Sequence, residues 1–191
     1  RQKKKFNRSS EPEKPLYTID DVRRMSKQFE PVGFHEWKEV HNGVRVRLHH
    51  AGHILGAAVV ELELLDDGEI KRVVFTGDLG RRDQPILNDP EPVERCDVLI
   101  SESTYGNRMH PASGDVKAEL QRVICEASTR QGKVVVPAFS LGRTQMLVYL
   151  MNQLRNENAM CRVPVFVDSP LATRLTEAHR EHSDQMDDEV R

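Results

Sequence analysis

Three residues of the types that bind metals or move protons each follow a strand-like stretch of this sequence. His53 lies in Ala-Gly-His-Ile-Leu-Gly (51–56), Asp78 in Phe-Thr-Gly-Asp-Leu-Gly (75–80), and Glu102 directly after a short apolar run. Glycines flank His53 and Asp78, and loops at strand ends are places where a rigid scaffold displays ligands. Because a carboxylate can bridge two divalent ions, and ions about 3.5–4 Å apart suit attack at phosphate, the pattern indicates part of a metal site for hydrolysis.

Each of these residues also has a purely structural interpretation. His53 would then be a loop histidine, Asp78 a turn residue, and Glu102 a surface charge. One His and one Asp cannot hold two ions, so further ligands would have to come from elsewhere. The occurrence of all three at strand ends favours the functional interpretation without excluding the structural one.

Two predicted strand-to-helix junctions in the second half carry groups that bind phosphate. The first reads Pro-Ala-Phe-Ser-Leu-Gly-Arg-Thr-Gln (137–145) and the second Val-Asp-Ser-Pro-Leu-Ala-Thr (167–173). Free N–H groups and the helix dipole both favour an anion at a helix N-terminus. Helix capping alone also explains Ser140 and Ser169. Arg143 opposes the dipole in a first helical turn, and a bound anion would offset this.

The first half has the pattern of a strand-rich, two-layer sheet assembly. A capping box of Thr18 and Asp21 predicts a short helix. Asn42-Gly43 predicts a hairpin with a type I′ turn, after which Val44, Val46 and Leu48 face inward while Arg45, Arg47 and His49 face solvent. A second hairpin is predicted over 57–65 and 70–76, and a short strand over 97–101.

The second half alternates strands and helices, which is typical of a parallel α/β sheet. Ser113 is expected to cap a helix that has Gly132 at C′, the first position past its end. Helices are also predicted over 143–154 and 171–182, and buried strands over 133–137 and 163–167. A segment rich in Gly, Asn, Pro and Ser at 103–112 separates the halves, which predicts domains of residues 1–105 and 106–191.

The composition is that of a soluble chain with no overall affinity for polyanions. The 191 residues carry a net charge of −2 and 30% charged residues, with one basic cluster within residues 1–8. We therefore expect any nucleic-acid contact to be local. Cys96, Cys125 and Cys161 lack metal-site spacing, so we expect reduced thiols in a cytoplasmic protein. No signal peptide or membrane span is predicted.

The two loop motifs, the segment Ser-Glu-Ser-Thr-Tyr-Gly (101–106) and the two junctions resemble, in that order, the metallo-β-lactamase-fold β-CASP nucleases. The resemblance extends over residues 16–182. It implies an α/β fold: a partial αββα sandwich of the metallo-β-lactamase type, followed by part of a parallel α/β β-CASP domain.

The resemblance implies a role for each matching residue. His53 is similar to the histidine that binds one Zn²⁺, and Asp78 to the carboxylate that bridges two Zn²⁺ ions. Glu102 is similar to the acidic β-CASP residue that hydrogen-bonds a downstream histidine, so Asp78 and Glu102 are the expected catalytic pair. The turn carrying Ser140, Gly142 and Arg143, and the loop at Ser169 facing it, resemble segments that lie along a nucleic-acid backbone.

The chain also departs from the family pattern. The His-x-His-x-Asp-His signature, the later β-CASP histidine and the final zinc-binding histidine are absent from the sequence. The remaining histidines have no ligand spacing, and we expect His35, His41, His110, His179 and His182 to be surface or packing residues. The chain begins at Arg1 and ends in a charged segment, so we expect a fragment of a longer protein.

The expected function is zinc-dependent hydrolysis of RNA, or of single-stranded DNA, by the longer protein. The fragment itself should be inactive, and the protein is expected to act as a homodimer or within a processing complex, away from membranes. Two alternatives stay open. One is a catalytically inactive β-CASP subunit that binds RNA or acts as a scaffold, and the other is a lactamase-fold hydrolase of small esters or thioesters.

Overall fold

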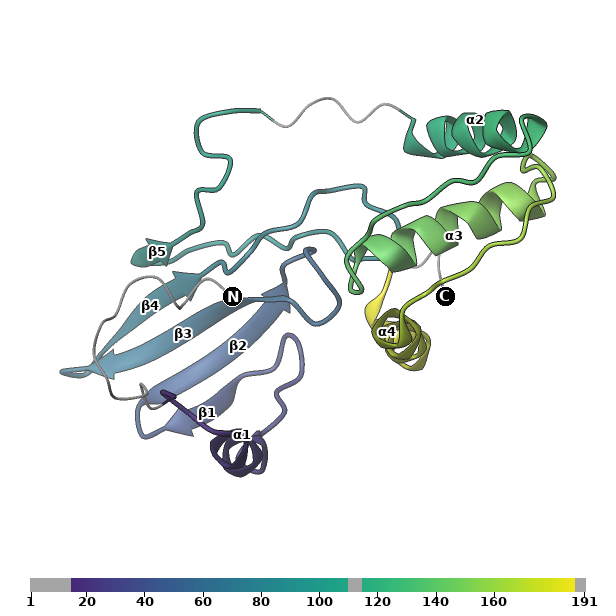
Figure 1. Ribbon diagram of the computed structural model, residues 1–191. Coiled ribbons are helices and arrows are strands. Elements are labelled where there is room, and N and C mark those ends of the chain that lie inside the picture. The colour runs from purple at the N-terminus through teal and green to yellow at the C-terminus, as the bar shows by residue number, and fades with distance from the viewer. Residues whose placement is uncertain (1–14, 110–114, 188–191) are drawn as a thin grey trace, which may run out of the picture. The chain divides into compact units, whose positions relative to one another are not determined.

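The computed structural model describes residues 15–109 and 115–187 (Figure 1). The chain forms two compact units, one ending at Val32 and one beginning at Gly33. The first unit contains helix α1 (Ile19–Ser26). The second contains strands β1 (Lys38–His41), β2 (Val44–His50), β3 (Ala58–Asp66), β4 (Glu69–Phe75) and β5 (Val98–Ile100), helices α2 (Val116–Thr129), α3 (Arg143–Asn156) and α4 (Pro170–Glu181), and a 3₁₀ turn, η2 (Ser183–Gln185). The mixture confirms the α/β class.

Helix α1 begins with the predicted capping box. The Thr18 hydroxyl accepts a hydrogen bond from the backbone N–H of Asp21, and the Asp21 carboxylate accepts one from the backbone N–H of Thr18 at 2.7 Å. These two bonds satisfy donors that a helix N-terminus otherwise leaves unpaired. None of the helix residues is buried, so the helix is held by its local hydrogen bonds.

The five strands form one sheet in the order β1-β2-β3-β4-β5, as Figure 1 shows. Both predicted hairpins are present, with β1–β2, β2–β3 and β3–β4 antiparallel. The type I′ prediction at Asn42-Gly43 is wrong, because only Gly43 has a positive φ (72°). That geometry occurs instead at Asp67 (47°) and Gly68 (85°), since a type I′ turn needs both central residues left-handed.

Strand direction brings three loops to one edge of the sheet. Strand β2 runs antiparallel to β3, which runs antiparallel to β4, and β4 is parallel to β5. Strands β2, β4 and β5 therefore all point the same way, and their carboxyl ends lie at the same edge. The loops that follow these ends carry His53, Asp78 and Glu102.

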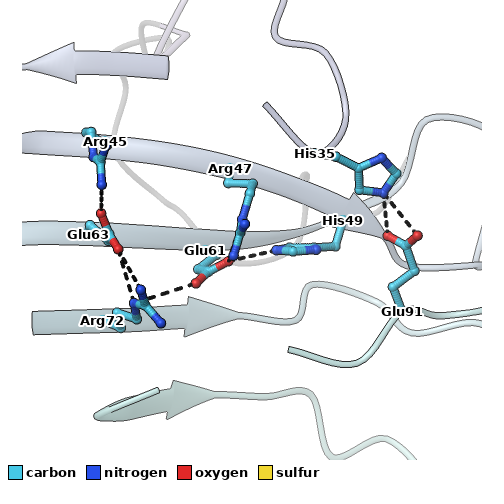
Figure 2. A network of polar contacts seen from close by, with 8 residues as sticks. All are labelled: His35, Arg45, Arg47, His49, Glu61, Glu63, Arg72 and Glu91. Carbon is cyan, nitrogen blue, oxygen red and sulfur yellow. Dashed lines mark hydrogen bonds and ion pairs between the residues drawn. The ribbon is translucent and has the colours of Figure 1, made fainter. Parts of the chain in front are cut away.

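One face of the sheet buries a ladder of charged residues, seen in Figure 2. Glu61 and Glu63 on β3 are only 1% and 5% exposed. Glu61 accepts hydrogen bonds from Arg47 at 2.7 and 2.9 Å and from His49 at 2.8 Å. Glu63 pairs with Arg45 and with Arg72. The prediction that His49 faces solvent is wrong, because a buried carboxylate beside it needs a donor.

The hydrophobic core of the sheet is small and lies on the same face as the ladder. It consists of Ala51, Val59 and Val74, with Val93 and Cys96 packed against them. Of the residues predicted to face inward on β2, Val46 is buried while Val44 and Leu48 are only half-buried. Through Val93 and Cys96, the segment 92–96 packs on these core residues and covers the face of the sheet that carries the ladder.

All three helices predicted in the second half are present, and α3 contacts both α2 and α4. Ser113 lies outside the described residues, and the N-cap of α2 is Asp115, whose carboxylate accepts from Ala118 N at 2.9 Å. Helix α2 ends in a Schellman motif with Gln131 left-handed (φ 54°) and Gly132 N donating to Ala127 O at 2.8 Å. Gln131 therefore occupies the C′ position that was predicted for Gly132, and Gly132 is the next residue.

The two strands predicted at 133–137 and 163–167 are not formed in the described part of the chain. Both segments are irregular and lie outside the sheet, and Val135 and Phe166 are 86% and 84% exposed. An apolar run indicates burial, but a strand also needs a hydrogen-bonded neighbour, and the described residues do not supply one. This prediction is wrong for both segments.

The expectation of reduced thiols is wrong for two of the three cysteines. Cys125 on α2 and Cys161 after α3 form a disulfide with Cα atoms 5.5 Å apart, whereas Cys96 is free. The bond joins residues 36 positions apart, so sequence spacing gave no indication of it. It ties the last turns of α2 to the chain that leads into α4.

No helix among the described residues is long and apolar enough to cross a membrane.

Replacing Glu61 with Gln should lower the free energy of unfolding by about 2–3 kcal/mol, because Arg47 and His49 would lose their shared anion. Burial acts to raise the pKa of Glu61, but hydrogen bonds from His49 and Arg47 outweigh it and hold the pKa below 4.5. The stabilisation by the carboxylate is therefore complete above pH 4.5 and is lost as the pH falls through the lower folded-state pKa. Urea unfolding of both proteins should show that the difference between their free energies of unfolding becomes smaller as the pH falls from 7 to 3.

The exposed Glu69→Gln substitution on β4 is the matched control, and it should change stability by less than about 0.5 kcal/mol. Equal losses for the two variants would contradict a structural role for the buried ladder.

Candidate metal and phosphate-binding site

His53 and Asp78 lie together at the loop edge of the sheet. Nε2 of His53 is 3.9 Å from Oδ2 of Asp78, and their side chains are 45% and 76% exposed. This separation is too long for a hydrogen bond. A zinc ion binds imidazole nitrogen at about 2.0–2.1 Å and carboxylate oxygen at about 2.0–2.2 Å, so one ion can contact both atoms. The structure thus places two predicted ligands where they fit a shared ion.

Glu102 fixes the loop that carries Asp78. Its carboxylate accepts a hydrogen bond from the backbone N–H of Leu79 at 2.7 Å, and its own N–H donates to the hydroxyl of Thr76 at 3.2 Å. Hydrogen bonds from Thr104 and then from Leu79 lower the pKa of Glu102, and nearby His53 lowers it further. The carboxylate is therefore ionised at neutral pH and holds the Asp78 loop from the neighbouring strand end.

The loops of His53 and Asp78 are in backbone contact. Gly80 N donates to Ala51 O at 2.7 Å, and a Cβ at Gly80 would overlap the carbonyl group of Gly52. Gly52 is itself left-handed (φ 65°) and lies against Pro90. Because only glycine permits this approach, the spacing between the two candidate ligands depends on residues 52 and 80.

The predicted phosphate-binding turns also lie together. Ser140 and Ser169 have their hydroxyl oxygens 3.4 Å apart. Gly142, the N-cap of α3, is left-handed (φ 79°) and has no side-chain cap bond, whereas Ser169 caps α4 by accepting from Ala172 N at 3.2 Å. Capping therefore explains Ser169 but not Ser140. Arg143 is exposed, and no hydrogen bond or ion pair of its guanidinium occurs among the described residues.

Gln145 is a part of this site that the sequence analysis did not single out. It is 4% exposed, and its Nε2 donates to Ser140 O at 3.1 Å and to the Thr176 hydroxyl at 3.0 Å. These bonds link the turn before α3 to helix α4. A polar residue among the apolar inward positions of α3 was the available signal. Its Oε1 is buried and has no hydrogen-bond partner in the described residues.

The metal loop and the phosphate-binding turn are neighbours within the second unit. A Cβ at Gly142 would lie 3.5 Å from Cγ2 of Ile54, the residue after His53. An anion held at the start of α3 would therefore lie near the loop that carries His53.

Residues 144–191 match the Beta-Casp domain family. The chain is 32% identical over 181 residues to Endoribonuclease YSH1 of Kluyveromyces lactis, which covers 92% of this chain and 23% of the relative. Residues 144–191 are therefore part of a β-CASP domain, and most of the chain is similar to proteins named as endoribonucleases.

Two further relatives are similar to most of the chain. Cleavage and polyadenylation specificity factor 73 of Drosophila melanogaster is 30% identical, covering 94% of this chain and 26% of that protein. Endoribonuclease ysh1 of Schizosaccharomyces pombe is 33% identical, covering 94% and 23%. The chain therefore spans about a quarter of the length of these relatives. The predicted boundary between residues 105 and 106 stays a prediction.

Replacing Gly80 with Ala should destabilise the protein by at least about 2 kcal/mol, because the new methyl group meets backbone and not a flexible side chain. Urea unfolding measures the loss. The control is Gly33→Ala, where the new methyl group would meet only the end of Glu36 at 3.6 Å and φ is not positive. That variant should be unchanged or slightly more stable. A Gly80→Ala protein as stable as wild type would disprove the close approach.

Proposed function

We propose that this chain is part of a zinc-dependent ribonuclease that hydrolyses phosphodiester bonds of RNA. The observation that carries the proposal is the convergence of His53 and Asp78 at one sheet edge, 3.9 Å apart, in a chain that carries part of a β-CASP domain. Relatives named endoribonucleases support RNA as the substrate. The relative named for cleavage and polyadenylation supports a role in RNA processing within a complex.

Each of the candidate residues would have a distinct role. His53 and Asp78 would hold zinc, with Asp78 shared between two ions. Bound zinc would act as a Lewis acid and lower the pKa of water at the site. Glu102 would keep the Asp78 loop in position through the backbone N–H of Leu79. Two ligands do not complete a two-metal site, so we expect the 191 residues alone not to cleave RNA.

The RNA backbone would lie along the start of α3. Arg143 is exposed, and the first turn of α3 has no side-chain cap, so both offer donors to a phosphate. Ser140 and Ser169 would add hydroxyl donors, with Gly142 giving close approach. Single-stranded DNA offers the same phosphate chemistry, and cleavage assays on both nucleic acids distinguish the substrates.

Because the side chain of Asp78 is exposed, it can be replaced in the full-length protein to test the metal role directly. Asp78→Asn should reduce RNA cleavage by about 100-fold or more, since even residues that only support a metal ligand contribute 10–100-fold. Zinc content should fall in parallel, as measured by elemental analysis. Asp67→Asn, in the β3–β4 turn, is the matched control and should change neither quantity.

Normal cleavage by the Asp78→Asn protein would rule out the proposed metal role. A wild-type protein that binds RNA without cleaving it would favour the inactive scaffold subunit, and hydrolysis of small esters without RNA cleavage would favour the small-molecule hydrolase.

Arg143→Ala should weaken RNA binding at all sequences and reduce the slope of log affinity against log salt by about 0.7, the value for one phosphate of a single strand. Binding titrations at several salt concentrations measure the slope. Arg155→Ala, in the last turn of the same helix, is the control with an unchanged slope. Identical slopes for wild type and Arg143→Ala would remove Arg143 from the RNA path.

A further inference from the structure

A second group of metal-binding side chains lies in the same unit, apart from His53 and Asp78. His35, His50 and Glu91 each offer one ligand atom, and these atoms all lie within 4.8 Å of one another. In the part of the chain that the structure describes, this is the one group of three or more such side chains that could hold an ion. They come from three segments: the chain before β1, the end of β2, and the chain between β4 and β5.

Backbone hydrogen bonds hold these three segments together. Glu91 N donates to His50 O at 2.9 Å, and His50 N donates to Oε2 of Glu91 at 2.8 Å. His35 N donates to Leu48 O at 2.8 Å, and its φ of 67° is left-handed, which costs on the order of 1–3 kcal/mol for a residue with a side chain. The ring of His35 is thus placed beside Glu91 by its backbone and not by a flexible tether.

The side chains are oriented for a cation. Nε2 of His35 lies 2.9 and 3.0 Å from the two carboxylate oxygens of Glu91, as Figure 2 shows. The ring of His50 stacks on Phe34 with centroids 4.0 Å apart. The amide nitrogen of Asn88 lies 3.4 Å from Nε2 of His50. Because an amide nitrogen only donates, Nε2 is unprotonated in this contact, and an ion bound at Nε2 would take the place of the Asn88 amide.

Two imidazoles and one carboxylate form a zinc ligand set that leaves a fourth position for water. Oxygen-preferring ions such as Ca²⁺ and Mg²⁺ fit this set less well, because two of its three ligands are nitrogens. Stacking on Phe34 orients the His50 ring beside the other two side chains.

We propose that His35, His50 and Glu91 form a second divalent-cation site, with zinc as the fitting ion. The ion would join the chain before β1 and the segment around Glu91 to the end of β2, three residues before His53. It would brace the loop of the candidate catalytic metal without sharing a ligand with it. The proposal is independent of RNA cleavage, since none of its ligands belongs to the proposed active site.

Zinc content in an Asp78→Asn background tests the site, because that substitution weakens the other candidate site. In this background, Glu91→Gln should lower the zinc retained after dialysis by about one equivalent per chain, and so should His35→Ala. The amide oxygen of Gln can still accept from His50 N, so the Glu91→Gln protein should keep the backbone connection and fold. His41→Ala, an exposed histidine next to the β1–β2 turn, is the control and should retain zinc.

A folded Glu91→Gln protein that retains as much zinc as the His41→Ala protein would overturn the proposal. The result is separable from the proposed function: if His53 and Asp78 bind no zinc, Asp78→Asn leaves zinc content unchanged, yet Glu91→Gln still lowers it.

Discussion

The backbone contact between Gly52 and Gly80 is the constraint on which the candidate metal site depends. It holds the loop after β2 against the loop after β4, although the two strands are separated by β3 in the sheet. Glu102 adds a hydrogen bond from the end of β5, and Pro90 closes the other side of Gly52. The positions of His53 and Asp78 are therefore set by backbone contacts of their loops, and not by packing of their own exposed side chains.

The charged ladder on β2, β3 and β4 complements this arrangement. Apolar packing at the loop edge is limited to a few residues, and Glu61 and Glu63 occupy buried positions further along the strands. Their partners reach across from both neighbouring strands, so the ladder fixes the register of three strands. Because a one-residue slip would turn each of these carboxylates to the other face, the ladder also fixes which loops meet at the edge.

Much of the site could be predicted from local sequence. Strand ends, glycine-flanked loops and helix caps are short-range features, so the positions of His53, Asp78 and Glu102 and the helix starts near Arg143 and Ser169 followed from residue patterns. The strand order of the structure then brings the three loop residues to one edge of the sheet.

The remaining features depend on contacts between distant residues. The pairing of Cys125 with Cys161, the burial of His49 against Glu61, and the convergence of His35 with Glu91 each require knowledge of which segments are neighbours. The apolar segments 133–137 and 163–167 show the converse, because a strand-like pattern does not form a strand without a hydrogen-bonded partner. Gln145 was missed because its role lies between two helices.

Anomalous diffraction at the zinc absorption edge, from crystals of the full-length protein, would show directly whether His53 and Asp78 bind zinc. We expect a zinc peak within coordination distance of both Nε2 of His53 and a carboxylate oxygen of Asp78, at about 2.0–2.2 Å from each. A zinc-containing protein whose anomalous peaks all lie away from these two side chains would contradict the account.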